Sequence, residues 1–204
     1  MEGMAFTSNH PYWVKSEVLD ARWIHSTDPY VIDQTPGGYR IFESNATHKT
    51  TQSPAERKRQ KIEYTQNRIT ARLMADYYKD DVLLMPEIDH PDKDIRYTWE
   101  FLNRGYKTPN LDKLKVPDSF LLNKKLFYEV KSYKDNYSYN KLKRMAKNGS
   151  GQAGVNVFFI NQDLPYERIK NDLENYIDSL KKNKKEYSVT DVFAVINGSL
   201  YKIR

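Results

Sequence analysis

Six consecutive residues, Val155–Ile160, are apolar except for Asn156. Such a run predicts a strand buried on both faces, because a strand with one face in water alternates apolar and polar side chains. Helices are predicted on either side of it in the chain, over residues 137–148 and 165–182. We therefore expect a sheet that is flanked by helices.

A third and longer helix is predicted from residue 54 to about residue 79. Ser53-Pro54-Ala55-Glu56 combines the serine and glutamate of a capping box with a proline at the first helical position. Ile62, Ile69, Leu73 and Tyr77 fall on one helical face. We expect this face to be the apolar one that packs on the sheet.

The predicted strands complete the order of elements. They lie at 82–86, 118–122, 125–132, 155–160, 189–196 and 200–203, and the last two form a hairpin around Asn197-Gly198. From residue 53 onward the order is α-β-β-β-α-β-α-β-β. This order predicts an α/β (α+β) fold with a mixed central sheet flanked by helices.

Residues 1–50 are predicted to form a small β-rich N-terminal element. Strands are expected at 22–26, 30–35 and 39–43, with Pro36-Gly37-Gly38 as the turn between the last two. Residues 44–52 are almost entirely polar and are interpreted as a linker. The chain is thus expected to divide into residues 1–50 and a larger domain over residues 53–204.

Positive charge is concentrated in the larger domain. The chain has a net charge of +6, but residues 1–50 carry −2, and residues 121–150 hold eight basic and two acidic residues. Such a distribution favours nucleic acid as a partner, with an anionic membrane surface second; a soluble domain of high pI is the remaining alternative. The candidates for phosphate contact are Lys141, Arg144 and Lys147 on one helix face, with Lys134 nearby; a solvated helix face is the alternative. Among the sixteen tyrosines, Tyr128 and Tyr133 are the nearest candidates for base stacking; a core or half-buried position is the alternative expected for most of them.

Composition excludes several classes of protein. The chain has no cysteine, which excludes disulfides, thiolate metal sites and a cysteine nucleophile. No apolar run approaches 18 residues, so no membrane span is expected. The first residues lack a basic start followed by an apolar stretch, so no signal peptide is expected and the site of action is predicted to be cytoplasmic.

Two carboxylates and one ammonium are predicted to converge on a hairpin. Glu129 and Lys131 are two residues apart on one strand and therefore share a face. If Asn123-Lys124 is the turn, the numbers of paired residues sum to 247, which places Asp118 opposite Glu129. Directly paired residues have Cβ atoms about 4.5–5.5 Å apart.

This set of side chains predicts metal-assisted hydrolysis of a phosphodiester. Two close carboxylates repel each other unless a cation or a proton lies between them. Mg²⁺ suits such a site, with Mn²⁺ or Zn²⁺ as alternatives, because it binds one or two carboxylates together with waters and substrate phosphate. A neighbouring lysine can orient a water or stabilise charge on the phosphate.

Pro117-Asp118 and Glu129-Val130-Lys131, after a helix and a strand, resemble the PD-(D/E)XK nuclease superfamily. More narrowly, the chain resembles the C-terminal nuclease toxin domains of contact-dependent inhibition and other bacterial polymorphic toxin systems. Those domains share a run like LLMPEI at residues 83–88, a Lys-Ser pair like Lys131-Ser132, and a glutamine like Gln152. The resemblance covers roughly residues 60–203.

The resemblance implies a role for each matching residue. Asp118 and Glu129 are expected to bind the metal together with the Val130 carbonyl, Lys131 to be the catalytic lysine, and Gln152 to be an accessory group near the phosphate. Family members often carry a further acid on the first helix, where this chain has Gln66. Glu63, one helical turn earlier, is the expected substitute as a metal ligand. The resemblance also implies DNA or RNA as substrate, a toxin or mobile-element setting, and a cognate immunity protein.

Three other interpretations remain open at the level of sequence. The first is a nuclease-fold protein that binds nucleic acid without cleaving it, as Gln66 would suggest. The second is a site-specific nuclease of restriction or repair type. In the third interpretation, Glu129 and Lys131 form an ordinary surface ion pair that contributes less than about 1 kcal/mol.

Overall fold

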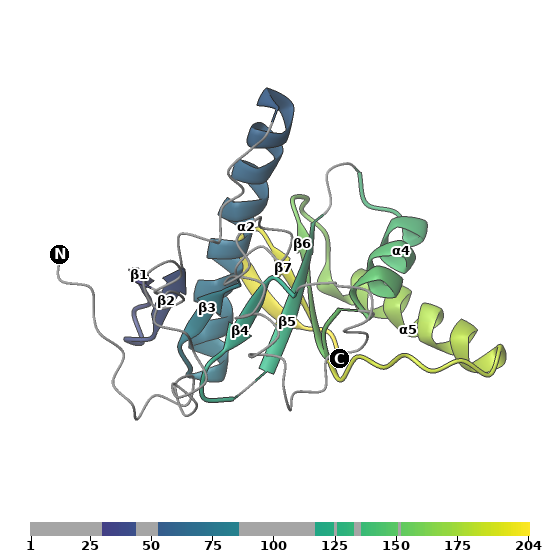
Figure 1. Ribbon diagram of the computed structural model, residues 1–204. Helices are drawn as coiled ribbons and strands as arrows, with labels where there is room; N and C mark the ends of the chain where they lie inside the picture. Colours follow the sequence, from purple (N-terminus) through teal and green to yellow (C-terminus); the bar gives the residue numbers. More distant parts are fainter. Residues whose placement is uncertain (1–29, 44–52, 86–116, 125, 133–135, 151) are drawn as a thin grey trace, which may run out of the picture.

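The computed structural model describes residues 30–43, 53–85, 117–124, 126–132, 136–150 and 152–204 (Figure 1). Its strands are β1 (Tyr30–Gln34), β2 (Arg40–Glu43), β3 (Val82–Leu84), β4 (Ser119–Leu121), β5 (Leu126–Ser132), β6 (Val155–Ile160), β7 (Asp191–Ile196) and β8 (Ser199–Lys202). Its helices are α2 (Pro54–Tyr78), α4 (Tyr139–Gly149) and α5 (Tyr166–Lys182). The predicted order of elements after residue 53 is confirmed.

All eight strands belong to one mixed sheet, in which they lie in chain order from β1 to β8. Strands β3, β4 and β5 form an antiparallel meander. Strands β5, β6 and β7 are parallel, with α4 and α5 as the crossover helices between them. Antiparallel hairpins, β1–β2 and β7–β8, form the two edges. The predicted mixed α/β fold is thus confirmed.

The β1–β2 hairpin is an extension of the main sheet, because β2 pairs in parallel with β3. The predicted turn at Pro36-Gly37-Gly38 is present, and Gly38 has a φ of 87°, which favours glycine. The predicted strand at 22–26 lies outside the described residues. The predicted division at residue 50 therefore remains a prediction.

Helices cover both faces of the sheet, as Figure 1 shows. On one face α2 packs through Ala71, Met74 and Ala75. On the other face α4 and α5 pack through residues such as Leu142 and Ile169. All six residues of β6 are buried: Val155, Val157 and Phe159 belong to the α2 core, and Phe158 and Ile160 belong to the α4–α5 core. This confirms the interpretation of the Val155–Ile160 run.

The buried face of α2 differs from the predicted one. Ile62 and Tyr77 are 49% and 48% exposed, and Ile69 is also exposed, whereas the residues at 66, 70, 71, 74 and 75 are buried. The small side chains of Ala71 and Ala75 allow the helix to lie close to the sheet, and the bulkier apolar residues are displaced to its flanks. Of the four predicted residues, Leu73 is partly buried against this core and Tyr77 contacts the Phe193 ring from the flank. The hydrophobic periodicity followed the large residues, so the predicted face is displaced from the buried one.

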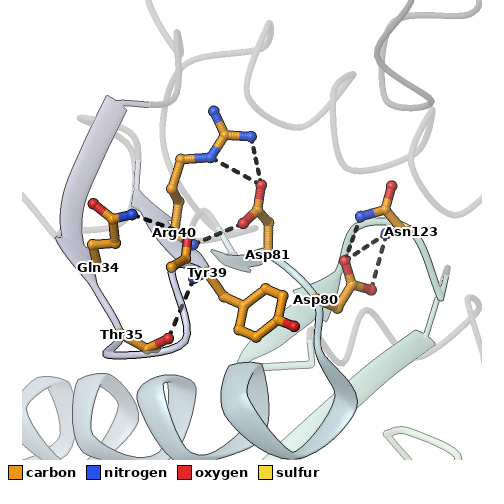
Figure 2. A network of polar contacts seen from close by, with 8 residues as sticks. Gln34, Thr35, Tyr39, Arg40, Asp80, Asp81 and Asn123 are labelled. Atoms are coloured by element: carbon orange, nitrogen blue, oxygen red, sulfur yellow. Dashed lines mark hydrogen bonds and ion pairs between the residues drawn. The ribbon is translucent and has the colours of Figure 1, made fainter.

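Two aspartates between α2 and β3 bind the turns at one end of the sheet (Figure 2). The Asp80 carboxylate accepts hydrogen bonds from the Asn123 amide side chain at 2.7 Å and from the backbone N–H groups of Asn123 and Lys124 at 3.0 and 2.8 Å. Asp81 accepts from the Arg40 backbone N–H at 2.7 Å and from its guanidinium at 2.6 and 3.0 Å. Asp80 therefore holds the β4–β5 turn, and Asp81 holds the β1–β2 hairpin.

Asp80→Ala is expected to lower the free energy of unfolding by about 1–3 kcal/mol, because it leaves several donors of the β4–β5 turn without their acceptor. Urea unfolding measures the change. Asp163→Ala is the matched control: Asp163 is exposed and, among the described residues, accepts one bond, from the Asn197 side chain at 2.9 Å, so we expect a change within about 0.5 kcal/mol. Equal unfolding midpoints for the two variants would contradict this role of Asp80.

Candidate active site

The β4–β5 hairpin has the predicted register. Ser119 pairs with Tyr128 and Leu121 pairs with Leu126, so the paired numbers sum to 247. The turn is longer than the two residues expected, because the strands end at Leu121 and begin again at Leu126. Asp118 directly precedes β4, and continuing the same register by one position places it opposite Glu129. The Val130 N–H donates to Asp118 Oδ2 at 2.8 Å.

Glu129 is buried beside Lys131 on the same face of β5. It is 3% exposed, and its Oε1 accepts a hydrogen bond from the Lys131 ammonium. The Lys131 side chain is 23% exposed, so this cation borders solvent. Glu129 Oε2 is buried and has no hydrogen-bond partner among the described residues. A buried carboxylate oxygen without a donor is costly unless a proton or a cation satisfies it.

Asp118 is held between the hairpin and α2. Its Oδ2 accepts from Val130, and its Oδ1 accepts from Asn67 Nδ2 at 3.2 Å. Its backbone carbonyl accepts from the Met85 N–H at 2.9 Å at the end of β3. Contacts from α2, β5 and the end of β3 thus fix this half-buried residue and its carboxylate.

The surroundings of Asp118 and Glu129 disfavour a state in which both carboxylates are ionised. Burial raises the pKa of Asp118 above its ordinary value, while Lys131 and the donors from Val130 and Asn67 act in the opposite direction. Burial, and then the charge of Asp118, raise the pKa of Glu129 well above its ordinary value, with Lys131 acting to lower it. Both carboxylates therefore gain from a positive charge placed between them.

Asn67 is the contact that the sequence prediction missed, because the prediction considered only acids and the position of Gln66. Gln66 is buried on α2, and Asn67, the next residue, contacts Asp118. A signal was present in the sequence: Asn67 lies one helical turn after Glu63, the position that the prediction did consider, so the same helical spacing leads to Asn67.

Glu63 lies one helical turn before Asn67, and its carboxylate is 3.8 Å from the Arg59 guanidinium. Within the described residues, no three His, Cys, Asp or Glu side chains form a group that could hold a metal ion. Glu63 therefore does not form a metal-binding group with Asp118 and Glu129 in this conformation. Its role as a metal ligand, like that of the Val130 carbonyl, stays a prediction.

The predicted nucleic-acid-binding residues are described in part. Arg144 and Lys147 are exposed on α4, opposite buried Leu142 and Ala146, as the sequence predicts. Lys141 is half-buried, and its ammonium donates to the Asn136 carbonyl at 2.9 Å. Lys134 lies outside the described residues.

Gln152 lies in the turn between α4 and β6, where its N–H donates to the Gly149 carbonyl at 2.9 Å.

Tyr128 is excluded as a candidate for base stacking. Its side chain is fully buried in the α2 core. Tyr128 precedes Glu129 on β5, so it points to the opposite face of the sheet. Tyr133, the other candidate, lies outside the described residues.

Comparisons with protein-family models, curated proteins and solved structures give no match for this chain. Across the described residues, no helix has the length and apolar character needed to cross a membrane.

Proposed function

We propose that this protein is a metal-dependent endonuclease of the PD-(D/E)XK type that hydrolyses phosphodiester bonds of DNA or RNA. The observation that carries the proposal is the buried Glu129 Oε2, which has no donor among the described residues and lies beside a second carboxylate and a partly exposed lysine. A structural ion pair alone gives no reason to bury a second, unsatisfied acidic oxygen.

The donor set fits a divalent cation such as Mg²⁺ or Mn²⁺, with Zn²⁺ as an alternative. Asp118 and Glu129 offer hard oxygen ligands, and their raised pKa values indicate that a positive charge between them is favourable. Asp118 and Glu129 would hold the ion, with the Val130 carbonyl as a further candidate. When bound, such an ion polarises a phosphodiester and lowers the pKa of a bound water.

Lys131 supplies the remaining charge of the site. Its ammonium binds Glu129 Oε1 and borders solvent at the same time. When a cation takes up the charge of Glu129, Lys131 is available to orient a water or to stabilise negative charge on a phosphate oxygen. In this proposal the two carboxylates bind the cation, and the lysine contacts the phosphate or the attacking water.

The substrate class is tested by incubating the full chain with plasmid DNA and with total RNA. Each substrate is combined with Mg²⁺, Mn²⁺, Zn²⁺ or EDTA. The proposal expects loss of at least one substrate with a divalent ion and none in EDTA. Cleavage at discrete sites of the plasmid would instead favour a restriction or repair enzyme.

A second candidate function is a nuclease-fold protein that binds nucleic acid without cleaving it. The specific observation in its favour is that an amide, Asn67, contacts Asp118 from the helix that carries an acid in related nucleases. Binding without cleavage under every metal condition would support it.

The biological setting is also a proposal. The resemblance to polymorphic toxin domains favours a bacterial toxin or mobile-element nuclease that acts in the cytoplasm and is held inactive by a cognate immunity protein. Expression of the chain in bacterial cells tests the toxin role. The expected result is growth arrest by the wild-type chain and none by Glu129→Gln.

Binding to nucleic acid is expected to weaken steeply with salt. Arg144 and Lys147 are exposed together on α4, and each phosphate contact contributes about −0.9 to the slope of log K against log salt. In a Glu129→Gln background, Arg144→Ala with Lys147→Ala should make the slope shallower by about 2.

Fluorescence anisotropy with labelled DNA and RNA measures these slopes. The control is Lys170→Ala with Lys182→Ala, which removes the same charge from exposed positions of α5 and should leave the slope almost unchanged. Equal effects of the two double variants would mean that α4 contributes only net charge.

A further inference from the structure

Asn67 is the only contact that α2 makes with an Asp118 side-chain oxygen among the hydrogen bonds of the described residues. An ionised carboxylate has no proton to give, so only the Nδ2 end of the Asn67 amide can face it. The other Asp118 oxygen accepts from the backbone of β5. The two donors come from different elements, α2 and β5, and each holds one oxygen of the carboxylate, so together they fix its orientation.

The surroundings of Asn67 make this contact a rigid one. Gln66 and Thr70, its neighbours on α2, are buried, as is Ala71 one turn further on. The middle of α2 is therefore anchored to the sheet, and the Asn67 amide is presented to Asp118 from a fixed backbone. Rigid support of this kind is what keeps a metal-binding carboxylate in one orientation.

The chemical type of the residue at this position sets the charge of the site. An amide holds Asp118 without adding negative charge, so the described part of the site has two carboxylates, Asp118 and Glu129, against one ammonium, Lys131. One divalent cation compensates two carboxylates. A second divalent cation in the same place requires further anionic ligands, and none joins these two within the described residues.

We propose that Asn67 is a positioning residue that orients Asp118 and restricts the site to a single divalent cation. This inference rests on the proposed function. It concerns the number of ions and the support of the carboxylate, and neither follows from the assignment of the site as a nuclease.

The experiment is a titration of the full chain with Mn²⁺. Calorimetry and the EPR signal of unbound Mn²⁺ measure the number of ions bound and their affinity. We expect one Mn²⁺ per wild-type chain. Asn67→Ala should still bind one ion, with affinity reduced about 10–100-fold, the usual effect of losing a group that supports a metal ligand. Asn67→Asp replaces the amide with a third carboxylate of the same shape and should bind two ions.

Thr65→Ala is the matched control on the same helix. Its hydroxyl is exposed and donates to the Lys61 carbonyl of its own helix at 2.9 Å, so Mn²⁺ binding should be unchanged. Melting temperatures in EDTA identify variants that have lost the fold. If Asn67→Ala is unfolded, the Asn67→Asp titration decides, because a purely structural hydrogen bond predicts damage and no additional ion.

The outcomes separate the inference from the proposed function. Two ions on the wild-type chain, full affinity in Asn67→Ala, or one ion on Asn67→Asp would each overturn the inference and leave the nuclease proposal standing. Absence of Mn²⁺ binding to the wild-type chain would overturn the metal site itself and the inference with it.

Discussion

Glu129→Gln is expected to reduce the cleavage rate by about 10³-fold or more while the protein stays folded. The substitution keeps the size of the side chain but removes a buried negative ligand, so the cation loses much of its site. Metal polarisation of a phosphodiester contributes several kcal/mol, and each 1.36 kcal/mol is a factor of ten in rate. The measurement is the initial cleavage rate with excess Mg²⁺, with Glu174→Gln, an exposed residue of α5, as the control.

Stability measurements show whether this loss is chemical or structural. The pKa of Glu129 is raised in the folded state, so its ionisation destabilises the metal-free fold as pH rises above the ordinary range of glutamate. Glu129→Gln removes this effect. In EDTA the variant should melt no lower than wild type near neutral pH, and any advantage should shrink as pH falls towards 4.5. A variant that is unfolded at neutral pH would instead favour a structural Glu129–Lys131 ion pair.

Lys131→Ala is expected to lower kcat by about 10²–10³-fold, the usual effect of removing a group that stabilises charge in the transition state. Binding of Mn²⁺ should be retained, because the substitution removes a cation that competes for Glu129 Oε1. The comparison of kcat with Mn²⁺ affinity therefore separates a role on the phosphate from a role in the metal site.

Lys202→Ala is the control for Lys131→Ala. Lys202 pairs with Asp191 at 2.6 Å between β7 and β8, so it is also a strand lysine bound to an acid, but it lies outside the candidate site. Its removal should leave kcat unchanged. Normal cleavage by Lys131→Ala would mean that Lys131 is only an ion-pair partner.

The sequence predicted those features that depend on local pattern. The unbroken apolar run identified β6, and the Asn197-Gly198 turn identified the β7–β8 hairpin, where both residues have positive φ. The register of β4 and β5 followed from the position of the turn, and its continuation by one position places Asp118 opposite Glu129.

The features that were missed depend on packing between distant segments. The exposed side of α2 carries Ile62 and Tyr77, because Ala71 and Ala75 give the closer approach to the sheet. A pattern of large apolar side chains indicates which residues are hydrophobic, but it does not indicate how closely a helix packs on a sheet. The Asn67–Asp118 hydrogen bond joins residues 51 positions apart, and no local pattern marks an asparagine as a partner of a carboxylate.

A Mg²⁺ titration of the cleavage rate, with wild-type and Glu129→Gln chains side by side, tests the central claim most directly. The nucleic acid that the wild-type chain cleaves best serves as substrate, and each series begins in EDTA. The expected result is no cleavage in EDTA, a saturable rise with Mg²⁺ for the wild-type chain, and a flat response for Glu129→Gln. Cleavage that persists in EDTA, or equal Mg²⁺ curves for the two chains, would contradict the assignment of Asp118 and Glu129 as the metal site of a nuclease.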